Sequence, residues 1–309
     1  MEIIKNPTSS NGLLKSSGIG NFDGVHLGHK KIIQTIKDYS STHGTKSAII
    51  TFDPHPQKVL GKRDISLIYP FEQKVKLLKK EGIDYLICLS FTEELSKLSA
   101  EEFIKNILVD LLRIKNIVVG PGFTFGNQRK GNIDLLKSKG IEYDFKTIVV
   151  EPAYHNNLVV SSTLIRNYIE EGAIEKANDL FGSDYFIEGV VVEGEKRGRE
   201  IGFPTVNLKT NWELLPKNGV YATYVNLDNK IHQSITNIGF RPTFGENQLL
   251  IETHIFDYSN DLYGKSIKVN FVKRLRDEKK FDAVDSLVRQ IHNDVNNVKE
   301  ILKVHSIGN

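Results

Sequence analysis

The first half of the chain alternates between short strand-like runs and segments with helical periodicity. The strand-like runs lie at residues 16–22, 46–52, 85–91, 115–120 and 145–150. Between them, the apolar positions repeat as on one face of a helix; after His29 that face carries Ile32, Ile33, Ile36 and Tyr39. Short strands that alternate with amphipathic helices favour a parallel sheet with right-handed crossovers.

After about residue 183 the pattern changes to strands separated by turns. Strand-like runs lie at 185–194, 218–239, 249–259 and 265–275, and the stretch Leu227–Lys230 predicts a hairpin. The last stretch is helical again, and one face carries Phe281, Val284, Leu287, Val288, Ile291, Val295 and Val298. We therefore expect an α/β domain at residues 1–183, and at 184–309 a small antiparallel barrel or sandwich with a C-terminal helix.

Helix-boundary signals support this division into elements. Ser99 and Glu102 predict a capping box ahead of an amphipathic helix. Two short helices are predicted just before the change of pattern, and the second ends at Gly182.

Composition narrows the class of protein. The 309 residues are 39% hydrophobic and 26% charged, with a net charge of only +3, so we expect no nucleic-acid partner. No apolar run reaches the roughly 20 residues that cross a bilayer, and the start of the chain lacks the pattern of a signal peptide. Cys88 has no second cysteine with which to form a disulfide. We expect a cytoplasmic protein with no membrane partner.

His26 and His29 stand where a predicted strand ends and a helix begins. A zinc site usually needs three or four ligands, and a helical histidine pair would prefer a spacing of four. Burial of both rings in the core is a second alternative. A phosphate site fits better, because free backbone N–H groups at a helix start favour an anion and imidazoles donate hydrogen bonds to phosphate oxygens.

Three other segments follow predicted strands in the same half. They are "TFDPHP" at 51–56, "GPGFTFG" at 120–126 and "SSTLIR" at 161–166. The last opens a helix with hydroxyl groups and brings Arg166 one turn later, which would suit a second phosphate cradle. Each segment alone could be an ordinary turn or helix cap. Together they predict one crevice along the carboxyl edge of the sheet.

The combination of "GNFDGVHLGH" with these three segments resembles the FMN adenylyltransferase module of prokaryotic bifunctional riboflavin kinases/FAD synthetases, over about residues 16–183. The resemblance implies a nucleotidylyltransferase with a Rossmann-like parallel sheet. It implies catalytic roles for His26, His29 and Arg166. It implies nucleotide and phosphate contacts at Gly20, Asn21, Phe22, Asp23, Gly24, Gly28, Ser161, Ser162 and Thr163. It implies flavin contacts at Asp53, His55, Phe123, Phe125 and Gly126. Gly122 departs from the family, which often has a polar residue there.

In the second half, residues 189–208 are rich in glycine and charge. A flexible hairpin is one interpretation, and a loop that closes over phosphates is the other. Thr205 and Asn207 alternate along an extended segment, so both side-chain oxygens can face one cation. Hard oxygen ligands of this kind suit Mg²⁺, which usually keeps waters and nucleotide phosphates as its remaining ligands.

This stretch resembles the P-T-A-N motif of riboflavin kinases, with Val206 in place of alanine, and the resemblance extends over about residues 185–303. It implies a small β-barrel that uses ATP and Mg²⁺. It implies that Glu252 is the catalytic base, although a strand glutamate is more often simply exposed. It implies phosphate contacts at Gly194, Gly198, Arg199, Gly202, Thr205 and Asn207. It also implies a flavin contact at Arg276, within a charged run that otherwise predicts a solvated surface.

The leading hypothesis is therefore a bifunctional enzyme. Riboflavin is phosphorylated to FMN in the C-terminal domain, and FMN is adenylylated to FAD in the N-terminal domain, each with ATP and Mg²⁺. One alternative keeps only one module active. Another makes the protein a non-enzymatic flavin or nucleotide sensor, which would leave riboflavin and ATP unchanged on incubation.

Overall fold

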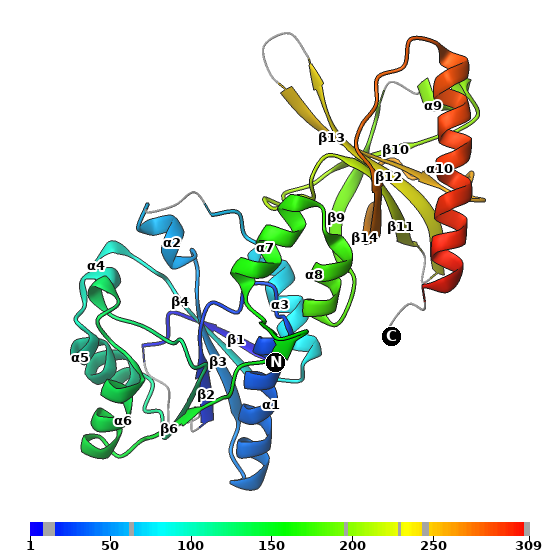
Figure 1. The fold of residues 1–309 in the computed structure, drawn as a ribbon. Coiled ribbons are helices and arrows are strands. Elements are labelled where there is room, and N and C mark those ends of the chain that lie inside the picture. The colour runs from blue at the N-terminus through cyan, green and yellow to red at the C-terminus, as the bar shows by residue number, and fades with distance from the viewer. Residues whose placement is uncertain (9–15, 62–64, 195–196, 228–229, 243–246, 306–309) are drawn as a thin grey trace. The chain divides into compact units, whose positions relative to one another are not determined.

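The computed structural model of this chain describes residues 1–8, 16–61, 65–194, 197–227, 230–242 and 247–305. The chain divides into two compact units, Met1–Ser162 and Thr163–Asn309 (Figure 1). The division falls inside helix α7 (Ser162–Glu171), whereas the sequence pattern predicts a boundary between residues 183 and 184. The helices that the structure describes include none with the length and apolarity of a membrane span.

The first unit is built on a parallel six-stranded sheet of order β1-β4-β3-β2-β5-β6, as the alternating pattern predicts. Its strands are β1 (Glu2–Lys5), β2 (Ser16–Ile19), β3 (Ser47–Phe52), β4 (Tyr85–Leu89), β5 (Asn116–Val119) and β6 (Lys146–Val149). A small antiparallel pair follows, β7 (Tyr154–His155) and β8 (Leu158–Val159). The strands β1, β7 and β8 have no counterpart among the predicted runs, and all three are short and largely exposed.

Helices cover both faces of this sheet (Figure 1). They are α1 (Leu27–Thr42), α2 (Pro56–Val59), α3 (Phe71–Lys80), α4 (Glu93–Lys97), α5 (Ala100–Glu102), the π-helix η1 (Phe103–Leu111), the 3₁₀-helix η2 (Asn127–Arg129) and α6 (Ile133–Glu142). Ile49 packs with α1 and α3, whereas its neighbour Ile50 packs with η1 and α6. Successive strand residues point to opposite faces, so both faces of the sheet are buried. The predicted capping box of Ser99 and Glu102 is confirmed.

The second unit contains a closed antiparallel barrel, which confirms the predicted β-barrel. The strands run in the order β10-β13-β12-β11-β14-β9. They are β9 (Tyr185–Val192), β10 (Val206–Lys209), β11 (Gly219–Leu227), β12 (Lys230–Pro242), β13 (Asn247–Ile255) and β14 (Ser266–Arg276). Leu227 pairs with Lys230 as the predicted hairpin requires, and the turn residues 228 and 229 lie outside the described residues.

The helices of the second unit are α7, α8 (Ile174–Phe181), the short α9 (Arg197–Glu200) and the long α10 (Val284–Val304), which lies along the barrel (Figure 1). Gly182 ends α8 with a left-handed φ of 67°, as predicted. Asn178 of α8 donates to the carbonyl of Phe271 on β14 over 2.8 Å. Phe281 precedes α10, and Val284 is 62% exposed, so the predicted apolar face of this helix begins later than expected.

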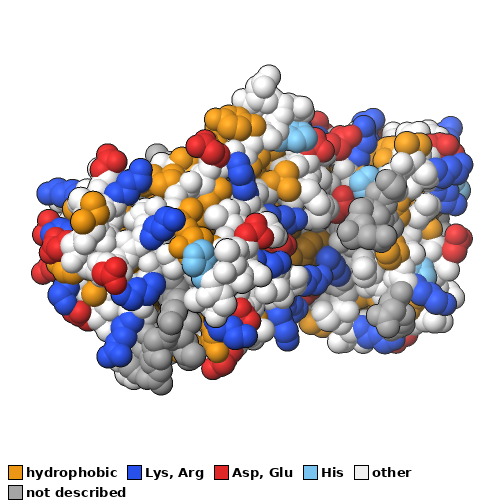
Figure 2. All heavy atoms as spheres, turned by 90° about the horizontal axis from the view of Figure 1, so that it is seen from below, with side chains coloured by type: hydrophobic (Ala, Val, Ile, Leu, Met, Phe, Trp, Pro, Cys, Tyr) orange, Lys and Arg blue, Asp and Glu red, His pale blue; other side chains and the backbone are white. Residues whose placement is uncertain are grey.

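Four buried hydroxyl side chains on three neighbouring barrel strands form a hydrogen-bonded chain. Thr223 is 2.8 Å from both Ser234 and Thr236 between hydroxyl oxygens, and Thr236 is 2.9 Å from Thr253. All four side chains are fully buried. A hydroxyl can donate as well as accept, so these contacts give all four polar groups a partner, without which their burial would be costly. On the face drawn in Figure 2, basic and acidic side chains are interspersed.

Candidate functional sites

The loop between β2 and α1 carries the first candidate site, and its backbone is unusually bent. Phe22 and Val25 have positive φ angles of 49° and 44°, and Gly24 has a φ of 90°. A left-handed β-branched residue such as Val25 is an outlier that the surrounding structure must hold in place. Asp23 helps, because its carboxylate accepts from the N–H of Ile68 at 3.2 and 3.3 Å.

His26 and His29 are packed against each other at the start of α1. His26 is buried and is the N-cap of this helix, and its Nδ1 accepts from the backbone N–H of His29 over 3.4 Å. The two rings stack with centroids 3.7 Å apart, and Phe22 lies 5.1 Å from the ring of His29. A Cβ at Gly28 would lie 3.1 Å from the imidazole of His26, so a larger residue at this position would press on that ring.

The electrostatics of the pair follow from this packing. Because Nδ1 of His26 accepts a hydrogen bond, the ring carries its proton on Nε2. Burial, and then the neighbouring His26 and Lys74, hold the pKa of His29 well below its usual range. Nδ1 of His29 is buried and has no hydrogen-bond partner within the described part of the chain. At neutral pH His29 is thus an uncharged imidazole that can donate a hydrogen bond.

The predicted segments that follow the other strands reach this loop to different extents. Thr51, at the end of β3, donates to the carbonyl of Asn21 over 3.2 Å. Ser162 donates to the carbonyl of Asp23 over 2.8 Å. Ser161 also belongs to the first unit, whereas Thr163 and Arg166 lie further along α7, in the second unit.

The predicted flavin residues of the first unit divide into anchors and partly exposed groups. His55 is buried and accepts from the N–H of Gln57 over 3.2 Å, so it caps α2. Phe125 is 8% exposed and packs on Phe103, whereas Phe123 and Asp53 stay partly exposed. The sequence alone did not separate these two kinds of residue.

Gly126 explains why the Phe-x-Phe-Gly loop must end in glycine. Its φ is 70°, and a Cβ there would come within 2.7 Å of the backbone of Ala100. The N–H of Asn127 also donates to the carbonyl of Leu98 over 2.7 Å. The loop is therefore seated directly on the start of α5, and no side chain fits between them.

The second candidate site is a cavity of about 470 Å³ between the barrel and α10. Five residues predicted from the sequence line it, namely Gly198, Thr205, Asn207, Glu252 and Arg276. The other predicted phosphate contacts, Gly194, Arg199 and Gly202, lie on the same loop between β9 and β10. A Cβ at Gly194 would lie 2.0 Å from the amide nitrogen of Asn207, so the loop crosses very close to that side chain.

Strand pairing aligns the central polar groups of this cavity. Asn207 of β10 stands opposite Glu252 of β13, and Glu252 stands opposite Asn237 of β12. All three residues line the cavity, and they form one polar row across three strands. Asn207 and Glu252 were predicted as site residues, whereas Asn237 was given no role, because only the register brings it beside Glu252.

Arg276 lines the cavity but is held by an acidic partner on α10. Its Nε and Nη2 lie 2.9 and 2.7 Å from Oδ2 of Asp294, which is buried, and its Nη1 donates to the carbonyl of Asp277 over 2.9 Å. Gln290 donates to the other carboxylate oxygen over 2.8 Å. Arg276, which is predicted to contact the flavin, therefore also joins β14 to α10 through its guanidinium group.

Two further residues of this cavity escaped the sequence analysis. His254 lies two residues after Glu252 on the same strand face, and its Nδ1 is 2.7 Å from the carbonyl of Pro204. This contact makes Nδ1 the protonated nitrogen. Phe203 packs edge-on against His254, with ring centroids 5.6 Å apart. Together they fix the segment that leads into Thr205 and Asn207.

Neither site holds a cluster of three His, Cys, Asp or Glu side chains placed to bind a metal, as far as the described residues extend. The His26–His29 pair thus lacks, within those residues, the further ligands of a zinc site. Thr205 and Asn207 both line the second cavity, two positions apart in the chain. This donor set fits a hard cation whose other ligands are phosphates and water.

Comparison with known protein families also divides the chain into two parts. A family model described as FAD synthetase matches residues 14–164, and one described as riboflavin kinase matches residues 181–302. A protein of Buchnera aphidicola is 38% identical over 93% of both chains, and one of Bacillus subtilis is 38% identical over 89% of both. Both are named bifunctional riboflavin kinase/FMN adenylyltransferase.

A solved structure also resembles the chain over nearly its whole length. It is a Streptococcus pneumoniae protein described as a macrolide-efflux protein, 29% identical, with a TM-score of 0.87 and coverage of 97% of this chain and 99% of the other. The likeness supports the fold of both units.

Proposed function

Because this chain belongs to the family of bifunctional riboflavin kinases/FMN adenylyltransferases, we propose how its two units divide the two reactions. The chain is an enzyme of flavin cofactor biosynthesis that uses ATP twice. It phosphorylates riboflavin to FMN, and it transfers AMP from ATP to FMN to give FAD and pyrophosphate. The observation that carries the division is that the first unit holds the His26–His29 pair and the second unit holds the polar row of Asn207, Glu252 and Asn237.

In the first unit, an oxygen of the FMN phosphate attacks the α-phosphorus of ATP, and pyrophosphate leaves. No covalent intermediate is needed, so catalysis rests on positioning and on stabilising the charge of the transition state. His26 and His29 supply hydrogen-bond donors at the start of α1, where the helix dipole also favours an anion. The sequence motif also implies phosphate contacts for Ser161, Ser162, Thr163 and Arg166, of which Thr163 and Arg166 lie on the part of α7 that belongs to the second unit.

In the second unit, Glu252 accepts the proton of the riboflavin 5′-hydroxyl as its oxygen attacks the γ-phosphorus of ATP. The polar row supports this assignment, because Asn207 and Asn237 flank Glu252 and all three line one cavity. The loop of Gly194, Gly198, Arg199 and Gly202 covers the phosphates. Arg276 borders the flavin and at the same time ties α10 to the barrel.

Magnesium is part of this proposal. Thr205 and Asn207 would hold Mg²⁺ together with the ATP phosphates, and the ion would neutralise phosphate charge when bound. Both residues are placed by β10 and the segment before it, which Phe203 and His254 fix.

The test is to incubate the purified chain with riboflavin, ATP and Mg²⁺ in one tube and with FMN, ATP and Mg²⁺ in another, and to separate the flavins. We expect FMN and then FAD from the first tube, and FAD from the second. Removal of Mg²⁺ with EDTA should stop both reactions. If the protein makes FAD from FMN but no FMN from riboflavin, or the reverse, only one module is active. If both flavins are unchanged, the protein is a sensor rather than an enzyme.

The cytoplasmic location and the absence of nucleic-acid and membrane partners stay predictions from composition. Riboflavin, FMN and ATP as small-molecule substrates fit the family to which the chain belongs.

A further inference from the structure

Lys74 is a buried lysine that the sequence pattern gave no reason to place in a site. It lies on α3 and is 8% exposed, and it is the only lysine or arginine among the buried polar residues that the structure describes. A lysine is seldom fully buried unless its ammonium group is paired, because desolvation of the charge is costly. The partners of this ammonium therefore indicate what the residue does.

Those partners belong to the adenylyl-transfer site. Nζ of Lys74 lies 3.2 Å from the carbonyl oxygen of Asn21 and 3.2 Å from the hydroxyl of Thr51. The hydroxyl of Thr51 itself donates to the same carbonyl over 3.2 Å. The three groups thus join the loop before His26 to the end of β3. An ammonium has three N–H donors, and these contacts use two of them.

The surrounding charges come from four elements of the first unit. Asp23 in the loop, Asp53 after β3 and Cys88 on β4 oppose the effect of burial, which lowers the pKa of Lys74. His29 on α1 faces the same ammonium, and the pKa of His29 is lowered by Lys74 as well as by burial and His26. Two carboxylates thus favour the charged lysine, while the lysine favours the uncharged histidine.

We propose that Lys74 is a positioning residue of FMN adenylylation. Its ammonium holds the Asn21 carbonyl and the Thr51 hydroxyl together, and so fixes the bent loop that presents His26 and His29 to the phosphates. It also brings the positive charge of the protonated ammonium close to His29. The inference rests on the proposed phosphate role of the histidine pair.

The different roles of Lys74 and the histidines follow from their charges. Two stacked imidazoles and a nearby ammonium cannot all be cationic at neutral pH without strong repulsion. Lys74 carries the charge, and His29 acts as a neutral hydrogen-bond donor whose position the loop sets. Protonation of His29 in acid would therefore weaken the site, and loss of Lys74 would raise the pH at which this protonation occurs.

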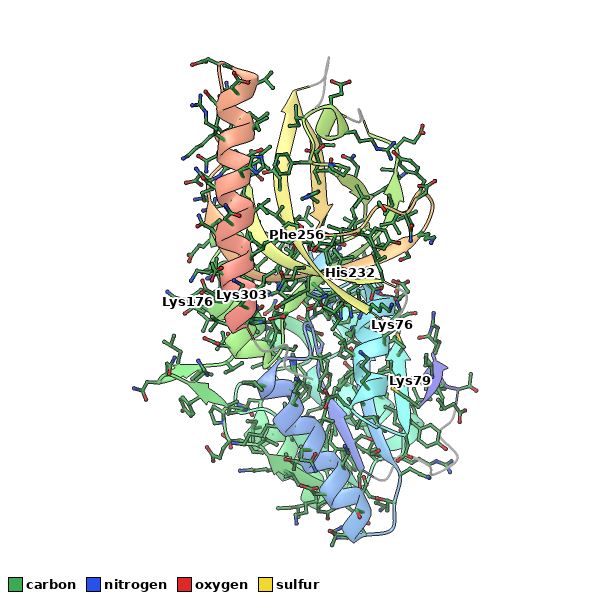
Figure 3. The ribbon with its side chains drawn as sticks, turned by 90° about the vertical axis from the view of Figure 1, so that its right-hand side faces the viewer. Lys76, Lys79, Lys176, His232, Phe256 and Lys303 are labelled. Atoms are coloured by element: carbon green, nitrogen blue, oxygen red, sulfur yellow. The ribbon has the colours of Figure 1, made fainter. Side chains whose placement is uncertain are left out.

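The test compares Lys74→Met, which keeps the length of the side chain but removes the ammonium, with Lys74→Arg, which keeps a charge. Lys79→Met is the matched control, since Lys79 is an exposed lysine of the same helix (Figure 3). We expect Lys74→Met to lower kcat for FAD formation about 100-fold, with riboflavin phosphorylation within about twofold of the unmodified chain. Lys74→Arg should recover part of the loss, and the control should change neither reaction.

A purely structural role is separated by the pH profile and by NMR. In Lys74→Met the acid limb of the FAD-formation profile should move to higher pH, and the His29 imidazole should titrate closer to its ordinary pKa. Unchanged kcat for FAD formation in folded Lys74→Met, or loss of both activities together, would overturn the proposal.

If Lys74→Met does not fold, Thr51→Val decides, because it keeps the ammonium and removes one of its two partners. A several-fold drop in FAD formation alone supports the inference, and no drop contradicts it. His29→Ala, measured in parallel, tests the premise that the histidines contact the phosphates. Normal FAD formation in this variant would contradict that premise. Normal FAD formation in the Lys74 and Thr51 variants alone would contradict only the role of Lys74.

Discussion

The polar groups of the first unit are concentrated in a short stretch of chain, whereas those of the second come from strands that are far apart in sequence. Asn21, His26 and His29 lie within nine positions, and a bent loop and a helix start arrange them. Asn207 and Glu252 become neighbours only through the pairing of β10 with β13. The first site therefore depends on local backbone conformation, and the second depends on strand register.

Glu252→Gln should break the second site with the largest effect. The amide keeps the shape of the side chain but is too weak a base to take the hydroxyl proton, so riboflavin phosphorylation should fall about 10²- to 10⁴-fold. Conversion of added FMN to FAD should persist, because the FMN phosphate is already ionised. Separation of the flavins after incubation with each substrate measures both. Glu188→Gln, at a half-buried glutamate of β9, is the control. Normal FMN production would remove Glu252 from the mechanism.

Asp294→Asn should destabilise the second unit and leave the first unit unchanged. It removes the counter-charge of the half-buried Arg276, and breaking a buried ion pair typically costs about 3–5 kcal/mol. Unfolding in urea can be monitored by the loss of riboflavin kinase activity and by the loss of FAD formation, which report on the second and the first unit respectively. Glu300→Gln, which removes an exposed ion pair with Lys303 on the same helix, should cost less than about 1 kcal/mol.

A double variant sharpens this prediction. Arg276→Met combined with Asp294→Leu replaces the pair by apolar groups and should restore stability. If Arg276 also contacts the flavin, the KM for riboflavin stays raised in the double variant. A normal KM with restored stability would confine Arg276 to its structural role.

His29→Ala should break the first site alone. Loss of one preorganised donor to the transferring phosphates typically costs about 10²- to 10³-fold in rate, so FAD formation should fall by that factor while riboflavin phosphorylation continues. His43→Ala, at the exposed C-terminal end of the same helix, is the matched control. Equal loss of both activities in a folded variant would contradict the assignment of one reaction to each unit.

Gly126→Ala should have the smallest effect and should act on flavin binding. The positive φ and the approach to Ala100 make any side chain strained there, at about 1–3 kcal/mol. We expect a raised KM for FMN and a lower thermal stability of the first unit. Gly122→Ala offers the control, because a Cβ at that position meets no atom within 4 Å. Equal behaviour of the two variants would mean that the loop does not depend on its seat at Ala100.

The features that can be predicted from the sequence are those that depend on residues close together in the chain. The strands β2 to β6 and the barrel strands other than β10 appear as apolar runs, and the cap at Ser99 appears as a spaced pair of polar residues. The strand β1 was missed because its four residues are mostly exposed, and only parallel pairing with β4 makes them a strand.

Residues whose role depends on distant partners could not be identified in this way. Lys74 looks like a surface lysine, although its spacing from Phe71 and Leu78 puts it on the apolar face of α3. Asn237 needs the barrel register to reach Glu252. Arg276 was expected to face the flavin, and its partner Asp294 lies on a different element, where no sequence pattern links the two.

The buried hydroxyl chain inside the barrel acts as a check on assembly. A strand shifted along its neighbour would separate Thr236 from Thr223 and Thr253 and leave hydroxyl groups without partners in an apolar interior. Each such group costs about 1–3 kcal/mol, so misaligned barrels are penalised before any substrate arrives. The buried hydroxyl groups thereby favour one strand register, and the alignment of Asn207, Glu252 and Asn237 depends on that same register.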